Sequence, residues 1–262
     1  MKYALITGPT SGIGYYFAHE FAKQKIPLVL VARDELKLKS VADEFRGDYD
    51  LDVREIVTDL SHISAAQFVY AEVEKLGIEI GYLVNNAGIG DFAYFKDADE
   101  HKLAGMMNLN MHTLTMFTKS FLPQLLLNEG KILNVASTAA FQPGPTMAVY
   151  YATKSYVLSF SEALAEELKT TGVTVTALCP GATQSEFQKT AQMQDSALVK
   201  NKKLPSAEEV AEYGFKAMMQ GKRVAVHGFT NKVFVFLVRF LPRTLVTIFV
   251  HKIQGKPSNK GI

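Results

Sequence analysis

Cysteine is almost missing from this sequence: Cys179 is the single one among 262 residues, which excludes an intrachain disulfide. It lies in the apolar run 175–179, where a cysteine is usually just a small core residue. Chains without disulfides suit a reducing compartment, so we expect a cytoplasmic location, with membrane association left open by the tail. No leader segment is expected, because the opening MKYALITG has the pattern of a strand entering a glycine-rich turn.

An excess of charge of either sign is also missing. The net charge is +2 and no block of basic residues stands out, so nucleic acid is not an expected partner. The chain has no linker, internal repeat or low-complexity stretch, which favours a single domain. We expect no metal site.

Short runs rich in Val, Ile and Leu alternate with segments of helical periodicity. The expected strands are residues 3–7, 28–32, 53–58, 82–85, 131–136, 173–178 and 223–227. The expected helices are residues 14–25, 35–46, 62–76, 107–128, 150–170 and 207–220. Because the strands do not alternate polar with apolar residues, they resemble parallel strands covered on both faces. The predicted fold is α/β: a doubly wound, mostly parallel seven-stranded sheet, Rossmann-like, of order 3-2-1-4-5-6-7 with helices on both faces.

The first expected strand ends in the turn TGPTSGIG, whose glycines have the spacing GxxxGxG and precede a helix. Glycine lets backbone N–H groups approach a pyrophosphate, and the helix N-terminus adds positive potential. A turn needed only for strand–helix packing is the alternative, but this context favours dinucleotide binding. The candidate residues are Gly8, Thr10, Ser11, Gly12, Ile13 and Gly14.

The end of the second strand bears on the choice of cofactor. Ala32 stands where an NAD site commonly has an acid, and the next residue, Arg33, can bind a 2′-phosphate. Arg33 could equally be a solvated charge, and Asp34 is expected to cap the following helix. We predict that NADP(H) is preferred and that NAD(H) is also accepted. Asp59, followed by Leu60, either accepts from the adenine amino group or caps a helix.

Tyr150 and Lys154 form a YxxxK pair, which is weak alone because about one such pair arises by chance. Spaced four apart on a helix, the two side chains share a face. A fixed positive charge there would lower the phenol pKa toward the range that acid–base chemistry needs. The alternative is a half-buried aromatic residue and a solvated lysine.

Other polar residues follow strands on the same side. Ser137 ends the fifth strand, and its hydroxyl could bind a substrate carbonyl oxygen. Asn110 lies in the preceding helix, where its side chain or a helix kink could hold a water next to Lys154. The backbone after the fourth strand suits close passage by a ribose, at Asn86, Ala87 and Gly88. Each residue has a separate explanation, as a cap, a surface amide or a turn, but their joint occurrence favours one site.

Together these residues resemble the short-chain dehydrogenase/reductase family, in its short single-domain branch. The matches are TGxxxGIG at 7–14, NNAG at 85–88, Asn110, Ser137, YxxxK at 150–154 and a PGxxxT-like segment with Pro180, Gly181 and Thr183. Two departures stand out: the family's Thr usually lies later than Thr183, and many NADP-dependent members have a basic residue where this chain has Ser11.

The resemblance implies an oxidoreductase that moves a hydride between nicotinamide C4 and a carbonyl or secondary alcohol carbon of a small molecule. Ser137 would bind the carbonyl oxygen and Tyr150 would donate the proton. Lys154 would lower the tyrosine pKa and hold the ribose, and Asn110 would hold a water. It also implies a homodimer or homotetramer built on the helices carrying Asn110 and Tyr150. Residues 1–230 would be the Rossmann-type NADP-binding and catalytic domain, and 231–262 an apolar helical extension of it.

Two other functions are known for folds of this kind, and the sequence argues against both. A nucleotide sensor or scaffold on the same fold would have no need of a proton relay. A sugar-nucleotide epimerase or dehydratase is disfavoured by the glycine spacing and by the lack of a substantial C-terminal substrate domain.

The expected substrate pocket is apolar. Residues 183–204 should form a lid that contains Phe187, Met193 and Leu198, and the stretch after the fifth strand adds Phe141, Pro143, Met147 and Val149.

The tail 231–253 is apolar but is interrupted by Arg239, Pro242 and Arg243, so its apolar runs are too short for a membrane span. We expect two short helices split at Pro242. They would cover the pocket, contact a second subunit or bind a membrane surface peripherally.

Overall fold

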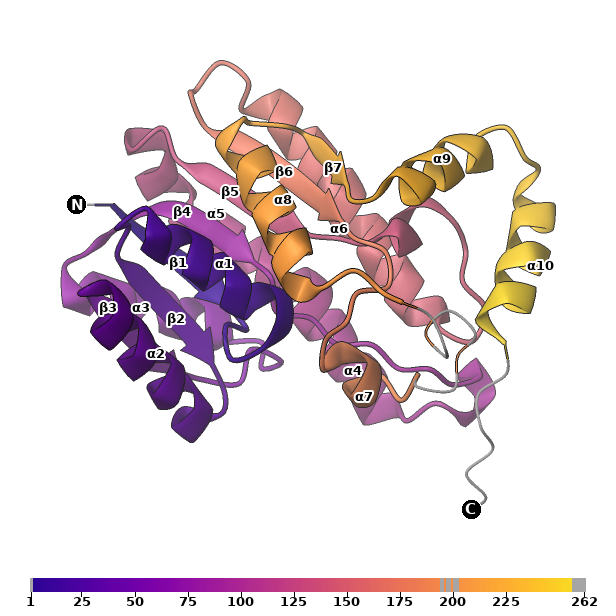
Figure 1. Cartoon of the computed structure of the whole chain (residues 1–262), viewed down its shortest axis with the longest axis horizontal. Helices are drawn as coiled ribbons and strands as arrows, with labels where there is room; N and C mark the ends of the chain where they lie inside the picture. The colour runs from indigo at the N-terminus through magenta and orange to yellow at the C-terminus, as the bar shows by residue number, and fades with distance from the viewer. Residues whose placement is uncertain (1, 194–195, 197–198, 200–202, 256–262) are drawn as a thin grey trace.

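A computed structural model describes residues 2–193, 196, 199 and 203–255 of the chain (Figure 1). Its strands form one sheet of order β3-β2-β1-β4-β5-β6-β7, in which every neighbouring pair is parallel. The strands are β1 (Lys2–Thr7), β2 (Leu28–Ala32), β3 (Val53–Val57), β4 (Glu79–Asn85), β5 (Lys131–Val135), β6 (Thr174–Cys179) and β7 (Val224–Val226). The predicted fold class and strand order are therefore confirmed, and the sheet is wholly rather than mostly parallel.

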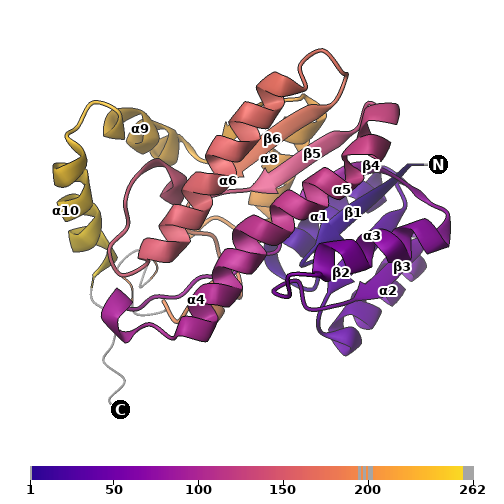
Figure 2. The ribbon, with the colours of Figure 1, turned by 180° about the vertical axis from the view of Figure 1, so that it is seen from behind.

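Helices cover both faces of the sheet. They are α1 (Gly12–Lys23), α2 (Glu35–Tyr49), α3 (Ala65–Leu76), α4 (Glu100–Met107), α5 (Leu114–Leu127), α6 (Ala148–Glu167), α7 (Phe187–Thr190), α8 (Ala207–Met219), α9 (Phe229–Val238) and α10 (Arg243–Gln254). Figure 1 shows α1, α2 and α8 in front of the sheet, and Figure 2 shows α3, α5 and α6 in front of its other face. Each layer buries its own apolar core, which includes Phe17 and Phe215 on the first face and Phe117 and Val69 on the second.

The helix expected at residues 107–128 begins earlier and is not uniform. Asp99 caps α4 by accepting a hydrogen bond from the Lys102 N–H at 2.9 Å. Between α4 and α5, Asn108–Thr113 is a π-helical segment, here labelled η2, rather than α-helix. A π segment inserts an extra residue per turn and is often found at functional sites.

The C-terminal tail folds as expected into two short helices, with α10 beginning directly after Pro242. In Figures 1 and 2, α9 and α10 extend beyond the β7 edge of the sheet as an angled arm. Among the described residues, no helix combines the length and apolarity that crossing a bilayer requires.

Candidate active site

A cavity of about 710 Å³ lies at the carboxyl ends of the strands. This is the edge at which doubly wound sheets bind ligands, near the point where the strand order reverses. The cavity brings together most of the residues proposed from the sequence: Gly8, Thr10, Ser11, Gly12, Ile13, Arg33, Asp59, Leu60, Asn86, Ala87, Gly88, Ser137, Tyr150, Lys154, Pro180, Gly181 and Thr183. Gly14 and Asn110 do not line it, and each acts through its neighbours.

The glycine-rich turn presents a helix N-terminus to the cavity. Gly8 and Gly12 have φ angles of 67° and 58°, a region that favours glycine. Ser11 occupies the N-cap position of α1 but makes no capping hydrogen bond with its side chain, and the first turn contains no acidic residue. The Gly8 N–H donates to the Val31 carbonyl oxygen at 2.9 Å, so it is the N–H groups in the first turn of α1 that can bind an anion, as a pyrophosphate site requires.

Gly14 is required by packing rather than by ligand contact. A Cβ added there would lie 2.2 Å from the Gly8 carbonyl oxygen and 2.4 Å from Asn86 Nδ2. Asn86 Nδ2 in turn donates to the carbonyl oxygens of Thr7 at 2.9 Å and Gly8 at 3.1 Å. Thr7, which the sequence did not single out, accepts from the N–H groups of Asn86 and Ala87 through Oγ1. These bonds fasten the end of β4 to the turn.

Charged residues of both signs lie beside the end of β2, where Lys37 Nζ is 4.0 Å from an Asp34 carboxylate oxygen. Arg33 and Lys37 both line the cavity, although only Arg33 was expected there. Asp34 caps α2 as predicted, accepting from the Lys37 N–H at 3.1 Å. Burial opposes the ionisation of Asp59, but hydrogen bonds from Ser61 and the charge of Arg33 hold its pKa below the usual range. Asp59 is thus an ionised acceptor on the cavity wall.

Tyr150, Ser137 and Lys154 meet where α6 crosses the end of β5. Tyr150 lies two residues inside α6, which starts at Ala148 rather than at Tyr150 itself. Lys154 Nζ is 5.8 Å from the centroid of the Tyr150 ring and donates to the Val135 carbonyl oxygen at 2.7 Å. Ser137 begins a short 3-10 turn, where its Oγ accepts from the Ala139 N–H at 3.1 Å, so it is also a cap.

Burial dominates the ionisation of this trio. Desolvation raises the pKa of Tyr150 to about 12, although a hydrogen bond with Ser137 acts in the opposite direction. Desolvation lowers the pKa of Lys154 to about 8. Burial therefore sets the pKa of Tyr150 here, because removing the phenol from water disfavours its charged form. That Lys154, together with the positive charge of a nicotinamide, lowers this pKa stays a prediction.

Asn110 does not line the cavity, but its side chain forms hydrogen bonds with two segments that do. Its Oδ1 accepts from the Ile89 N–H at 3.0 Å, while Nδ2 donates to the Ile89 carbonyl oxygen at 2.9 Å and to Thr153 Oγ1 at 3.0 Å. The side chain thereby links the loop after β4 to α6. A Cβ added at Gly88 would lie 3.3 Å from Asn110 Oδ1 and 3.4 Å from Lys154 Nζ. Asn110 and Lys154 thus approach the same stretch of backbone, and the π segment carries Asn110 there.

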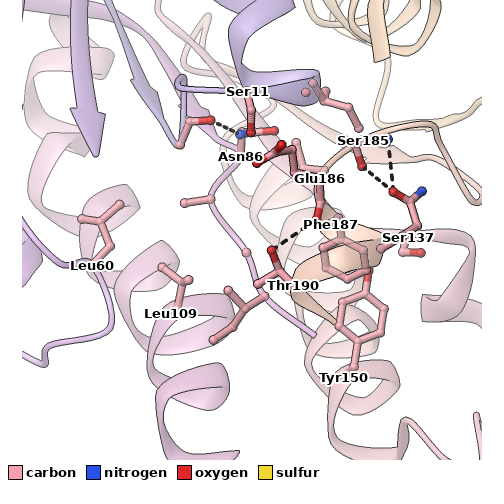
Figure 3. A pocket seen from close by; sticks show the side chains of 18 of the residues that line it. Ser11, Leu60, Asn86, Leu109, Ser137, Tyr150, Ser185, Glu186, Phe187 and Thr190 are labelled. Atoms are coloured by element: carbon pink, nitrogen blue, oxygen red, sulfur yellow. Dashed lines mark hydrogen bonds between the residues drawn. The ribbon is translucent and has the colours of Figure 1, made fainter. Parts of the chain in front are cut away.

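Apolar side chains line the cavity beyond Tyr150. The centroid of the Phe187 ring lies 5.4 Å from that of Tyr150, and Figure 3 shows the two rings side by side. Met147 and Met193 also line the cavity, as expected, whereas Phe141, Pro143 and Val149 do not. Leu198 lies outside the described residues. Sequence reasoning missed His101 and Lys102 of α4, for which the capping residue Asp99 was the available signal.

Known proteins with similar sequences are oxidoreductases. The family model for short chain dehydrogenase matches residues 2–196. Very-long-chain 3-oxoacyl-CoA reductase-A of Danio rerio is 34% identical over 187 residues, which are 68% of this chain but 57% of that protein. Hydroxysteroid dehydrogenase-like protein 1 of Gallus gallus is 33% identical over 228 residues, or 85% of this chain and 67% of its own length. This chain thus spans little more than half the length of the first relative.

A solved structure agrees with these matches. The short-chain dehydrogenase from Sphingobium yanoikuyae in complex with NADPH superposes with a TM-score of 0.81 at 28% identity, covering 92% of this chain and 94% of that one. The family model, the relatives and the fold all lead to one assignment. The chain belongs to the short chain dehydrogenase family.

Proposed function

We propose that this protein reduces the carbonyl group of an apolar small molecule with NADP(H) and catalyses the reverse oxidation. The observation that carries the proposal is the grouping of Tyr150, Ser137 and Lys154 between the glycine-rich turn and the apolar end of one cavity. With a pKa of about 12, Tyr150 keeps its proton at neutral pH and is therefore suited to donate it. NADPH, when bound, supplies the hydride for the carbonyl carbon.

The chain's own residues would handle the carbonyl oxygen. Ser137 donates a hydrogen bond to it, and Tyr150 transfers its hydroxyl proton as negative charge develops there. Lys154, charged below a pKa of about 8, favours the phenolate that remains and binds the ribose. Asn110 fixes the backbone at Ile89 and has a free lone pair on Oδ1 for the water that would return a proton through Lys154.

The cofactor proposal rests on two parts of the cavity wall: the N-terminus of α1 and the residues that follow β2. The open N-terminus of α1 fits a pyrophosphate, and Arg33 with Lys37 fits a 2′-phosphate, so NADP(H) is preferred and NAD(H) is accepted more weakly. Ala32 ends β2 without a carboxylate, and the nearby carboxylate of Asp34 accepts a hydrogen bond from the Lys37 N–H and forms an ion pair with Lys37. Asp59 remains available to the adenine amino group. The NADPH complex of the Sphingobium structure supports this choice.

The apolar lining supports a hydrophobic ketone as substrate. Phe187, Met147 and Met193 surround the space beside Tyr150. Two relatives support the same proposal by their names. One is a very-long-chain 3-oxoacyl-CoA reductase, and the other is a hydroxysteroid dehydrogenase-like protein. A panel of 3-oxoacyl esters, ketosteroids and aliphatic ketones, followed by NADPH oxidation, would rank these classes.

We also propose that the enzyme is a homo-oligomer built on α5 and α6. Tyr156 on α6 is 40% exposed and stacks on Phe160, and Met116 on α5 is also exposed. Exposed aromatic and methionine side chains are typical of protein interfaces. Light scattering of the full chain measures its mass.

Replacement of the proposed proton donor tests the mechanism. Tyr150→Phe removes the hydroxyl and should lower kcat for ketone reduction by at least about a hundredfold, the contribution expected of a general acid. NADPH affinity, measured by fluorescence titration, should stay within a few-fold because the ring remains in place. Tyr156→Phe on the same helix is the matched control and should retain wild-type rates. If the Tyr150 variant turns over normally, a sensor or scaffold function becomes the better interpretation.

A further inference from the structure

The helices α9 and α10 each have two apolar faces. On α9, Phe234, Val235 and Val238 point toward the body of the protein. On α10, Val246 and Val250 do the same, and they pack in one cluster with Met147, Tyr151 and Met193 beside the active site. This inner face accounts for the attachment of the arm to the body of the protein.

The outer faces remain exposed although they are equally apolar. They consist of Phe229, Val233, Phe236 and Leu237 on α9 and of Leu245, Ile248 and Phe249 on α10; the exposed Phe240 and Leu241 lie in the turn between the two helices. Phe240 is 70% exposed and Ile248 is 62% exposed. The spacing of three and four residues on each helix places the helical side chains along one side of it. Such a concentration of large apolar side chains on a surface marks an interaction site.

The charged residues of the arm itself have one sign. The sequence contains no Asp or Glu after Glu212. The arm carries Lys232, Arg239, Arg243 and Lys252, all exposed, and none of them forms an ion pair with a described residue. An apolar face on helices that carry only cations complements an apolar surface that carries negative charge.

A second copy of the chain is a poor candidate for an apolar partner that carries negative charge. In a twofold dimer the same patch faces itself, so the cations of one arm would lie against those of the other. The arm has no carboxylate with which to neutralise them, and like charges juxtaposed in an interface are costly. An anionic bilayer offers both missing partners, acyl chains for the aromatic and aliphatic residues and phosphates for the cations.

We propose that the outer faces of α9 and α10 bind the surface of an anionic lipid bilayer. The two helices lie in the interfacial plane without crossing it, since each is far shorter than a span. Because their inner faces share the cluster that contains Met147 and Met193, docking brings the apolar end of the cavity close to the membrane. The binding step is independent of the proposed reaction and is tested without turnover.

Flotation of the full chain with vesicles tests this proposal. Wild-type protein should float with vesicles of phosphatidylcholine and phosphatidylglycerol and should float less with phosphatidylcholine alone. Ile248→Asp and Phe240→Asp place an anion in the apolar face or in the turn beside it and should weaken binding by at least about tenfold. Arg239→Gln combined with Arg243→Gln should weaken binding to the anionic vesicles and leave binding to neutral vesicles unchanged.

The matched control is Leu127→Asp, which changes an 88% exposed leucine at the end of α5, away from the arm. It should float as the wild type does, and the unfolding temperatures of all variants should stay close to that of the wild type. The proposal is overturned if the wild type stays with the soluble fraction or if Ile248→Asp floats unchanged. It is also overturned if Ile248→Asp halves the mass found by light scattering while the wild type does not float, because a second copy then covers the face.

Discussion

Two neighbouring ionisable groups in this site respond to burial in opposite ways. Tyr150 is neutral when protonated, so desolvation raises its pKa to about 12, whereas Lys154 is charged when protonated, so desolvation lowers its pKa to about 8. Near neutral pH both groups hold their protons. These protonation states suit the proposed proton donation to a carbonyl, and Lys154 is the member whose charge changes first as the pH rises.

The proposed preference for NADP(H) rests mainly on the guanidinium of Arg33, which lines the cavity after β2. Arg33→Ala removes the proposed bidentate contact to the 2′-phosphate, a charge-assisted interaction, and should weaken NADPH binding by about ten- to a hundredfold. NADH lacks that phosphate, so its affinity should change little. Fluorescence titration with both cofactors measures the difference. An equal loss for the two would show that Arg33 acts on the structure of the site rather than on the phosphate.

At the scale of elements, those with the strongest local patterns were predicted best. The strands were found because their apolar runs are short and bounded, and Asp34 and Pro242 marked helix starts correctly. The π segment η2 was not predicted, since hydrophobic periodicity does not distinguish a widened turn from an α-helical one. The early start of α4 was missed because its first turn is polar, and with it the contribution of His101 to the cavity.

The junction of β1 and α1 offers a test of element packing. Gly14→Ala would push a methyl group into the Gly8 carbonyl oxygen and Asn86, so it should destabilise the fold by roughly 1–3 kcal/mol. Gly47→Ala in α2 is the matched control, because nothing lies within 4 Å of the added Cβ. It should stabilise by about 0.4–1 kcal/mol through reduced chain entropy. Urea unfolding measures the free energy of unfolding of each variant, and similar urea midpoints for the two would contradict the packing argument.

At the scale of the whole molecule, the parallel sheet assembles the site, and no single motif does so alone. Its lining comes from the loops after β1 through β6, which lie together only because the parallel strands end at one edge. Residues at strand ends were therefore predictable once the strand order was. Lys37 and His101 were not, because they reach the cavity from helices whose placement depends on tertiary packing. The hydrogen bonds by which Asn86 and Asn110 connect neighbouring loops could not be predicted either, since a sequence shows an amide but not its partners.

Because the cavity draws on so many elements, ligand binding should stabilise the entire fold. NADPH at a hundred times its dissociation constant adds about 2.7 kcal/mol to the free energy of unfolding if it binds only the folded chain. For a domain of this size, that corresponds to a rise in Tm of roughly 5 °C, measured by differential scanning calorimetry. NADH at the same concentration should raise Tm less, and in Arg33→Ala the NADPH shift should fall to the NADH value. Equal shifts for both cofactors in the wild type would place the 2′-phosphate outside the contacts that Arg33 and Lys37 offer.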